Sequence, residues 1–283
     1  MWQKIWFTLI VVLGLNFSLA AYAETKQEMG TVINLAGKQR MLTQKMTKEI
    51  LLIAQGIDTD ANRASLQKTA VLFDEILQGL LDGNTELVLP KTTSPKIVQR
   101  LKKVARFWKG FQKNVVVILE GKISKEILED ISEQSILLQQ NINKAVRMYA
   151  QASNSSLEPA MAITIHLAGK QRMLTQKMTK ELLLVANSIA IEENKVYLKT
   201  TTALFERTLN GLFDGDKGLA LPGTQNTAIR TQLEIVQKLW KKYQPILDAV
   251  NVSKAGLNKA AQLNLQLLEQ TDKAVELFEQ SIK

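Results

Sequence analysis

The 283-residue chain contains no cysteine and a single histidine, His166. The missing cysteines exclude disulfides, thiolate metal sites and a cysteine-linked lipid anchor, and one histidine cannot by itself supply a zinc site or a histidine-based catalytic triad. The sequence also lacks a glycine-rich phosphate loop, a carboxylate dyad and a nucleophile motif. We therefore expect no metal site, no cofactor and no enzymatic activity.

Signals for β-strands are nearly missing too, because no stretch alternates apolar and polar residues over a sustained length. Leu, Lys, Gln, Ala and Glu dominate instead, and these residues favour helices. Turn-forming residues divide the chain into expected helices near residues 26–57, 61–82, 95–120 and 123–156, and near 160–190, 192–214, 226–252 and 254–282. The sequence thus predicts an all-α fold of two tandem antiparallel four-helix bundles.

Proline is scarce, and two of the five prolines bear on this arrangement. Pro159 ends the junction at residues 153–159, which contains helix-capping residues and is either a short linker or a kinked continuous helix. Pro245 lies inside the third helix of the second half, where it should bend the helix. We place the first bundle at residues 24–156 and the second at residues 157–283.

The N-terminus has the features of a cleaved secretion signal. Lys4 precedes an apolar run at residues 5–15, and Ala21-Tyr22-Ala23 forms a small-x-small cleavage site. The run is shorter than the roughly 20 residues that a membrane-spanning helix needs. We therefore expect residues 1–23 to be removed and the mature protein to be soluble and exported to the periplasm.

The mature chain is basic, with 35 Lys and Arg residues against 27 Asp and Glu residues, a net charge of +8. This charge is spread over the helices rather than collected in a tail, and it favours anionic ligands or partners. Aromatic residues make up only 6% of the sequence and do not alternate with the basic ones as in a base-stacking surface. Nucleic-acid binding is not expected.

An internal repeat is the most informative feature that is present. The fifteen residues LAGKQRMLTQKMTKE occur unchanged at residues 35–49 and 167–181, an offset of 132 residues. At the same offset, residues 73–83 align with 205–215, residues 89–90 with 221–222, and Trp108 with Trp240. Elsewhere the two copies are identical at about a third of positions or fewer, which a packed core tolerates. The unchanged string therefore indicates a constraint stricter than packing.

A helical wheel separates two faces of the string. Leu35, Leu42, Met46 and Ile53 form the stripe that faces the bundle core. The opposite face holds Gly37, Arg40, Met41, Gln44 and Lys48, and in the second copy Gly169, Arg172, Met173, Gln176 and Lys180. An exposed face would have diverged, because surface Lys and Gln exchange at little energetic cost.

We expect the first helices of the two copies to pack through this second face. Gly37 and Gly169 would permit close approach and bring Arg40 together with Arg172. Two guanidinium groups repel each other unless an anion lies between them, and their planar shape suits a small oxyanion. Gln44 and Gln176 would add neutral donors, and Met41 and Met173 would exclude water.

Simpler interpretations exist for each of these residues. Arg40 is also explained by a surface or intrachain salt bridge, Gly37 by helix packing, and Met41 and Met46 by core packing. Lys38, Lys45 and Lys48 are typical of solvated lysines, so Lys48 and Lys180 are weaker ligand candidates.

Three further features have mainly structural interpretations. His166, which replaces Asn34 of the first copy, would tune the site with pH, although a packing role is favoured. Trp108 and Trp240 are expected core anchors. The sequences at residues 82–84 and 214–216 resemble calcium loops only briefly, because later ligand positions are not filled, and we interpret them as helix-ending turns.

The repeated string, preceded by Ile33-Asn34 and Ile165-His166, resembles the start of the periplasmic N-terminal domain of type IV pili methyl-accepting chemotaxis transducers, the PilJ-like family. It is also similar to the nitrate-binding region of nitrate/nitrite sensor kinases, with its Gly-x-x-Arg-Met core. The resemblance extends through both copies over nearly all of residues 26–283.

The resemblance implies a four-helix bundle. In nitrate-sensing members two protomers bind one anion between their first helices through the motif Arg and the backbone near the motif Gly. Here it implies Gly37, Arg40, Gly169 and Arg172 as site residues, with the tandem chain replacing a homodimer. The sequence departs from the transducers in having no second apolar run, kinase or methyl-accepting region.

Two functional hypotheses follow. In the first, a periplasmic sensor protein binds a small oxyanion, nitrate or nitrite, between its two repeats, and a membrane-bound receptor or kinase detects the change in helix angle or spacing. In the second, the repeated faces bind another protein, such as a chemoreceptor, sensor kinase or pilus component, with Arg40 and Arg172 as anchors. Pairing of the repeated faces within one chain favours the first hypothesis, and exposure of both faces in a monomer favours the second. The sequence also allows the faces to pair between two chains of a homodimer.

Overall fold

The computed structural model describes residues 26–152 and 159–281. Within these ranges it contains α-helices, one short 3₁₀ helix and two isolated β-bridges, and it has no β-strand. The all-α fold is therefore confirmed. The expected leader and the proposed cleavage site lie outside the described residues, as does most of the junction between the repeats.

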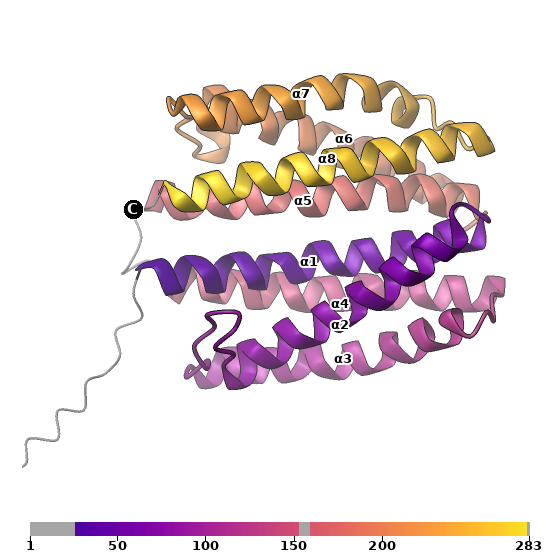
Figure 1. The fold of residues 1–283 in the computed structure, drawn as a ribbon, viewed down its shortest axis with the longest axis horizontal. Coiled ribbons are helices and arrows are strands. Elements are labelled where there is room, and N and C mark those ends of the chain that lie inside the picture. The colour runs from indigo at the N-terminus through magenta and orange to yellow at the C-terminus, as the bar shows by residue number, and fades with distance from the viewer. Residues whose placement is uncertain (1–25, 153–158, 282–283) are drawn as a thin grey trace, which may run out of the picture.

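Each repeat forms a bundle of four helices (Figure 1). The first bundle consists of α1 (Lys26–Ala54), α2 (Thr59–Asp82), α3 (Pro95–Leu119) and α4 (Lys125–Ala152). The second consists of α5 (Pro159–Ala186), α6 (Ile191–Asp214), α7 (Thr227–Asp248) and α8 (Lys254–Gln280), with η2 (Lys217–Leu219) between α6 and α7. In each bundle the first helix packs against the second and fourth, and the third completes the square.

The helices end where the sequence provides a reason. Gly83 and Gly215 close α2 and α6 with φ angles of 87° and 97°, a backbone conformation that glycine adopts without steric cost. Each is followed by a tight turn, closed by the bridges Asn84 to Leu89 and Asp216 to Leu221. These segments are the predicted helix-ending turns. Pro95 opens α3 at a position where its missing N–H is not needed.

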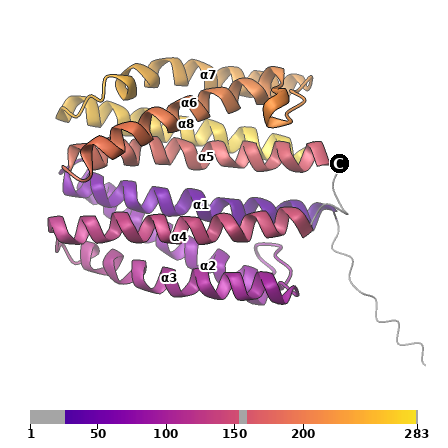
Figure 2. The ribbon, with the colours of Figure 1, turned by 180° about the vertical axis from the view of Figure 1, so that it is seen from behind.

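The two bundles lie side by side with α1 and α5 adjacent in the middle of the molecule and α3 and α7 at opposite outer edges (Figures 1 and 2). Helices α1 and α5 run parallel, since Gln55 near the end of α1 donates a hydrogen bond of 3.2 Å to the carbonyl of Ala186 at the end of α5. The repeated faces therefore pair within one chain.

Helix α4 runs antiparallel to α5, with Gln139 against Met173 and Arg147 beside His166 near the junction. The choice between a linker and a kinked helix at the junction falls on residues outside the described ranges and stays a prediction. Pro245 lies in the last turn of α7, so a bend there displaces little of that helix.

The core of each bundle is apolar and contains a matched tryptophan. Trp108 and Trp240 are 3% and 4% exposed, as expected of core anchors. Their rings lie 4.4 Å from Phe73 and 4.7 Å from Phe205, respectively, in tilted contacts. Among the described helices none is long and apolar enough to cross a membrane.

Candidate functional site

The repeated string is buried on nearly every side. Both faces distinguished on the helical wheel are covered: Leu42 and Met46 by the helices of their own bundle, and Arg40 and Met41 where α1 meets the second bundle. Helix α5 is buried in the same way over residues 168–185, with Lys170 and Lys177 only partly covered. A helix enclosed on all sides can accept few substitutions, which accounts for part of the identity between the copies.

Several contacts of the string are the same in both repeats and hold each bundle together. Gln39 donates a hydrogen bond of 2.8 Å to the carbonyl of Phe73, and Gln171 donates one of 3.0 Å to that of Phe205. Each contact joins the string to the second segment that the two copies share.

An ion pair between a partly covered lysine and a buried glutamate is repeated as well. Lys45 pairs with Glu49 and also donates to Ser65 and Thr69, each at 2.7 Å. Lys177 pairs with Glu181 in the second repeat. The prediction of a solvated Lys45 is wrong, because α2 supplies hydroxyl acceptors against that face of α1.

The arginines, by contrast, have different surroundings in the two repeats. Arg172 Nη1 lies 2.7 Å from Asp272 Oδ1 of α8, and Arg172 Nη2 donates to Asn34 Oδ1 of α1. Arg172 is 2% exposed, so these partners neutralise and hold a guanidinium that has left water. An intrachain salt bridge is therefore the observed environment of Arg172.

Arg40 is 4% exposed and has no ion-pair partner among the described residues. Its Nε is 3.4 Å from the carbonyl oxygen of Gly37, and a Cβ atom built on Gly37 would lie 3.2 Å from Arg40 Nη2. Gly37 thus leaves the space that the guanidinium occupies. At Gly169 the corresponding distance to Arg172 is 3.5 Å, an ordinary contact.

The surroundings of Arg40 are cationic. Burial, with the charges of Arg172 and Arg147, lowers the pKa of Arg40 from 12.5 to about 10. Burial and the charges of Arg40 and Arg147 also lower the pKa of Lys170. A buried guanidinium surrounded by other cations is an unfavourable arrangement unless an anion joins them.

The 132-residue offset explains this asymmetry. Arg147 of α4 stands at the position of Glu279 in α8, and Gln140 of α4 at the position of Asp272. The fourth helix of the second repeat thus brings two carboxylates to the Arg172 side, whereas that of the first repeat brings a cation to the Arg40 side. The first helices of the two repeats therefore contribute the same residues to the site, whereas the fourth helices contribute opposite charges.

Two titratable groups flank this region. Burial, followed by the charges of Arg40, Lys170 and Arg147, lowers the pKa of His166 to about 3, so the ring is neutral near pH 7. Its Nδ1 atom is buried and has no hydrogen-bond partner among the residues that the structure describes. Titration of His166 near neutral pH, the basis for expecting it to tune the site, is therefore not found. Burial raises the pKa of Glu279 to about 7, against the opposing charge of Arg172.

The remaining predicted residues lie farther along the helices. Gln44 Nε2 donates to Gln139 Oε1 at 2.6 Å, and Gln176 Nε2 donates to Asn264 Oδ1 at 3.1 Å. Each amide thus has one contact with the fourth helix of its own bundle, and the role of Gln44 and Gln176 as anion ligands stays a prediction. Met41 and Met173 are buried, in agreement with a water-excluding role.

Lys48 and Lys180 lie eight residues beyond the arginines, about 12 Å along an α-helix. Both are buried, at 5% and 4% exposure, which corrects the expectation of a solvated Lys48. Lys48 Nζ donates to Asn264 Oδ1 at 2.8 Å. These lysines therefore do not share a site with the arginines.

Four charged residues near the arginines escaped the sequence analysis: Arg147, Lys170, Asp272 and Glu279. Three of them lie on α4 and α8, 100 or more residues from the arginine that each faces. A comparison of the two copies at the 132-residue offset would have shown that the charge is reversed between Arg147 and Glu279.

The fold and the site define a tandem helical domain whose two repeats enclose basic residues at their interface. The chain belongs to the family described as the type IV pili methyl-accepting chemotaxis transducer N-terminal domain, PilJ, whose family model matches residues 23–134 and 153–268. This membership supports a signalling role. The residue boundaries of the two bundles remain a prediction.

The chain is also similar to a curated protein, the methyl-accepting chemotaxis protein McpN of Pseudomonas aeruginosa. The two are 28% identical over 147 residues, which cover 50% of this chain and 27% of that protein. The chain thus matches about a quarter of its relative's length. No solved structure matches the chain.

Proposed function

We propose that this protein is a non-enzymatic, exported sensor domain that binds one small oxyanion, nitrate or nitrite first, between α1 and α5. The observation that carries the proposal is the guanidinium of Arg40, which is buried among other cations and has no ion-pair partner in the described part of the chain. An anion there would supply the negative charge that Asp272 supplies to Arg172. Arg40 is the primary ligand residue of this proposal, and Arg172 is a supporting one.

The arrangement also suggests how binding would become a signal. An anion that bridges Arg40 to Lys170 or Arg172 would join the two repeats across their shared interface and so favour one spacing of α1 and α5. A ligand shifts the populations of two helix spacings only if it binds one of them more tightly than the other. A membrane-bound receptor or kinase is the proposed partner that responds to the change.

The alternative hypothesis, docking of another protein on the repeated faces, has less support. In the described structure these faces cover each other, so Arg40 and Arg172 are not available as surface anchors. Docking through other surfaces remains compatible with the signalling role.

Calorimetric titration of the mature protein with nitrate, nitrite, sulfate and acetate tests the proposal. Saturable binding of one anion per chain is expected, and Arg40→Met should abolish it. Arg172→Met is the matched control and should weaken binding less, because Arg172 already has a carboxylate partner. Equal loss in both variants, or no heat from any anion with folded protein, contradicts the proposal.

A further inference from the structure

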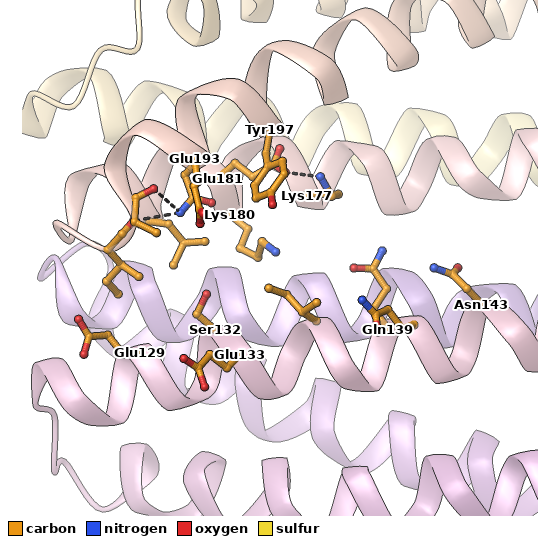
Figure 3. Close-up of a pocket in the computed structure, with 16 residues that line it drawn as sticks. Glu129, Ser132, Glu133, Gln139, Asn143, Lys177, Lys180, Glu181, Glu193 and Tyr197 are labelled. Atoms are coloured by element: carbon orange, nitrogen blue, oxygen red, sulfur yellow. Dashed lines mark hydrogen bonds and ion pairs between the residues drawn. The ribbon is translucent and has the colours of Figure 1, made fainter.

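A pocket lies between the repeats, away from the arginines. It has a volume of about 520 Å³, within the range of about 300–1,000 Å³ that is typical of small-molecule sites. Helices α4, α5 and α6 line it (Figure 3). The polar residues that line it include Ser132, Gln139, Asn143, Lys177, Lys180 and Glu181.

Lys180 is the unusual group in this pocket. Its side chain is 4% exposed and extends from α5 into the pocket (Figure 3). Within the described residues no hydrogen bond or ion pair joins its Nζ atom to another group. Burial lowers the pKa of Lys180 to about 8, with Glu181 opposing the shift, so the amine still carries a charge near pH 7.

The equivalent lysine of the first repeat shows what is missing. Lys48 donates to Asn264 of α8 at 2.8 Å, and Asn264 also bonds to Thr175 and Thr179. At the offset of 132 residues, the position of Asn264 is occupied by Ser132 in α4. The shorter serine does not reach Lys180, so the same lysine that is held by protein in one repeat faces a cavity in the other.

Acidic groups lie around the same cavity. Glu181 is buried and pairs with Lys177 through one oxygen, while its Oε2 atom has no partner. Glu49 of the first repeat has the same free oxygen, so this feature alone does not distinguish the pocket. Glu129, Glu133 and Glu193 are exposed and line its outer part. The pocket thus combines the buried cation of Lys180, and the partly covered Lys177 that pairs with Glu181, with further carboxylates in its lining.

We propose that this pocket binds a small zwitterion of the α-amino acid type, with its carboxylate on Lys180 and its ammonium toward Glu181 and the outer carboxylates. A carboxylate ligand satisfies the amine that Ser132 leaves free, and an ammonium group is attracted by the surrounding acids. A simple anion would pair only with the Lys180 amine, and the surrounding carboxylates would repel it. The proposal does not depend on the oxyanion site.

The test is a titration of the mature protein with each of the twenty standard amino acids, with acetate and methylamine as probes of the separate charges. At least one amino acid should bind saturably near one per chain, and acetate and methylamine should bind at least about tenfold more weakly. Absence of binding by all twenty amino acids overturns the proposal. If acetate binds as tightly as the best amino acid, the ammonium group contributes nothing and the assignment of a zwitterionic ligand is wrong.

Two variants locate the binding. Ser132→Asn introduces the partner that Lys48 has in the other repeat, and Lys180→Met removes the cation; each should weaken binding at least about tenfold. Lys48→Met is the matched control and should change affinity less than about twofold. Ser132→Asn keeps every charge, so it decides the question if Lys180→Met does not fold. Unchanged affinity in a folded Ser132→Asn variant refutes the assignment to this pocket.

A further variant separates this proposal from the oxyanion site. Arg40→Met should leave amino-acid affinity within about twofold, and Ser132→Asn should leave nitrate affinity unchanged to the same extent. Loss of both amino-acid and nitrate binding in either variant would mean that the two sites are not independent, which contradicts the assignment.

Discussion

Replacing Arg40 by methionine should stabilise the protein when no anion is bound. Burial and neighbouring cations lower the pKa of Arg40 from 12.5 to about 10. At about 1.4 kcal/mol per pKa unit, this shift corresponds to a cost of roughly 3 kcal/mol for keeping the guanidinium charged in the folded state. Because the folded-state pKa of this cation is depressed, the cost is fully present below pH 10 and is relieved only as the pH rises toward 12.5.

Methionine removes the charge and keeps an unbranched apolar side chain in the same space. We expect Arg40→Met to raise the free energy of unfolding by about 1–3 kcal/mol at pH 7 in low salt, as replacement of unfavourable buried charges by apolar residues often does. Arg172→Met should instead lower it by about 1–2 kcal/mol, since the bonds to Asp272 and Asn34 are lost.

Urea unfolding of the two variants and the parent protein measures these differences, with and without nitrate. Nitrate at 100 times its dissociation constant should stabilise the parent by about 2.7 kcal/mol and leave Arg40→Met unchanged. If Arg40→Met destabilises the anion-free protein as much as Arg172→Met does, then Arg40 has a compensating partner and the reasoning fails.

Three further predictions use the differences between the repeats. Gly37→Ala should weaken nitrate binding about tenfold and Gly169→Ala less than twofold, since an added Cβ meets Arg40 at 3.2 Å and Arg172 only at 3.5 Å; equal titrations would count against it. Trp108→Phe should cost about 1.5–3 kcal/mol more in urea unfolding than Trp240→Phe, because Trp108 Nε1 donates to Asp74 at 2.8 Å and Trp240 Nε1 is buried without a partner; similar losses would contradict this. Glu279, whose pKa burial raises to about 7, holds its proton more tightly in the folded state, so its contribution to stability falls as the pH rises from about 4.5 to 7. Glu279→Gln should therefore be more stable relative to the parent at pH 8 than at pH 4, and a pH-independent difference would exclude this assignment.

The elements of the fold could be predicted because their signals are local. Gly83, Gly215 and Pro95 mark helix ends, and the apolar periodicity of each helix identifies its core face. The repeated string further indicated a second buried face on α1 and α5, which the structure confirms for Arg40 and Arg172.

The charge balance of the site could not be predicted from the string, because it depends on other helices. Arg40 and Arg172 have identical sequence neighbours, yet Asp272 of α8 faces only one of them. Lys45 was misjudged for the same reason, since Ser65 and Thr69 of α2 turn an apparent surface lysine into part of a buried network. Side chains supplied by distant elements decide whether an identical residue is paired or free.

A crystal structure of the mature protein with nitrate would show directly whether Arg40 binds an anion. We expect one planar anion per chain between α1 and α5, bound to the guanidinium of Arg40 and nearer to it than to Arg172. An interface without an anion at saturating nitrate, or a carboxylate of the protein paired with Arg40, would contradict it.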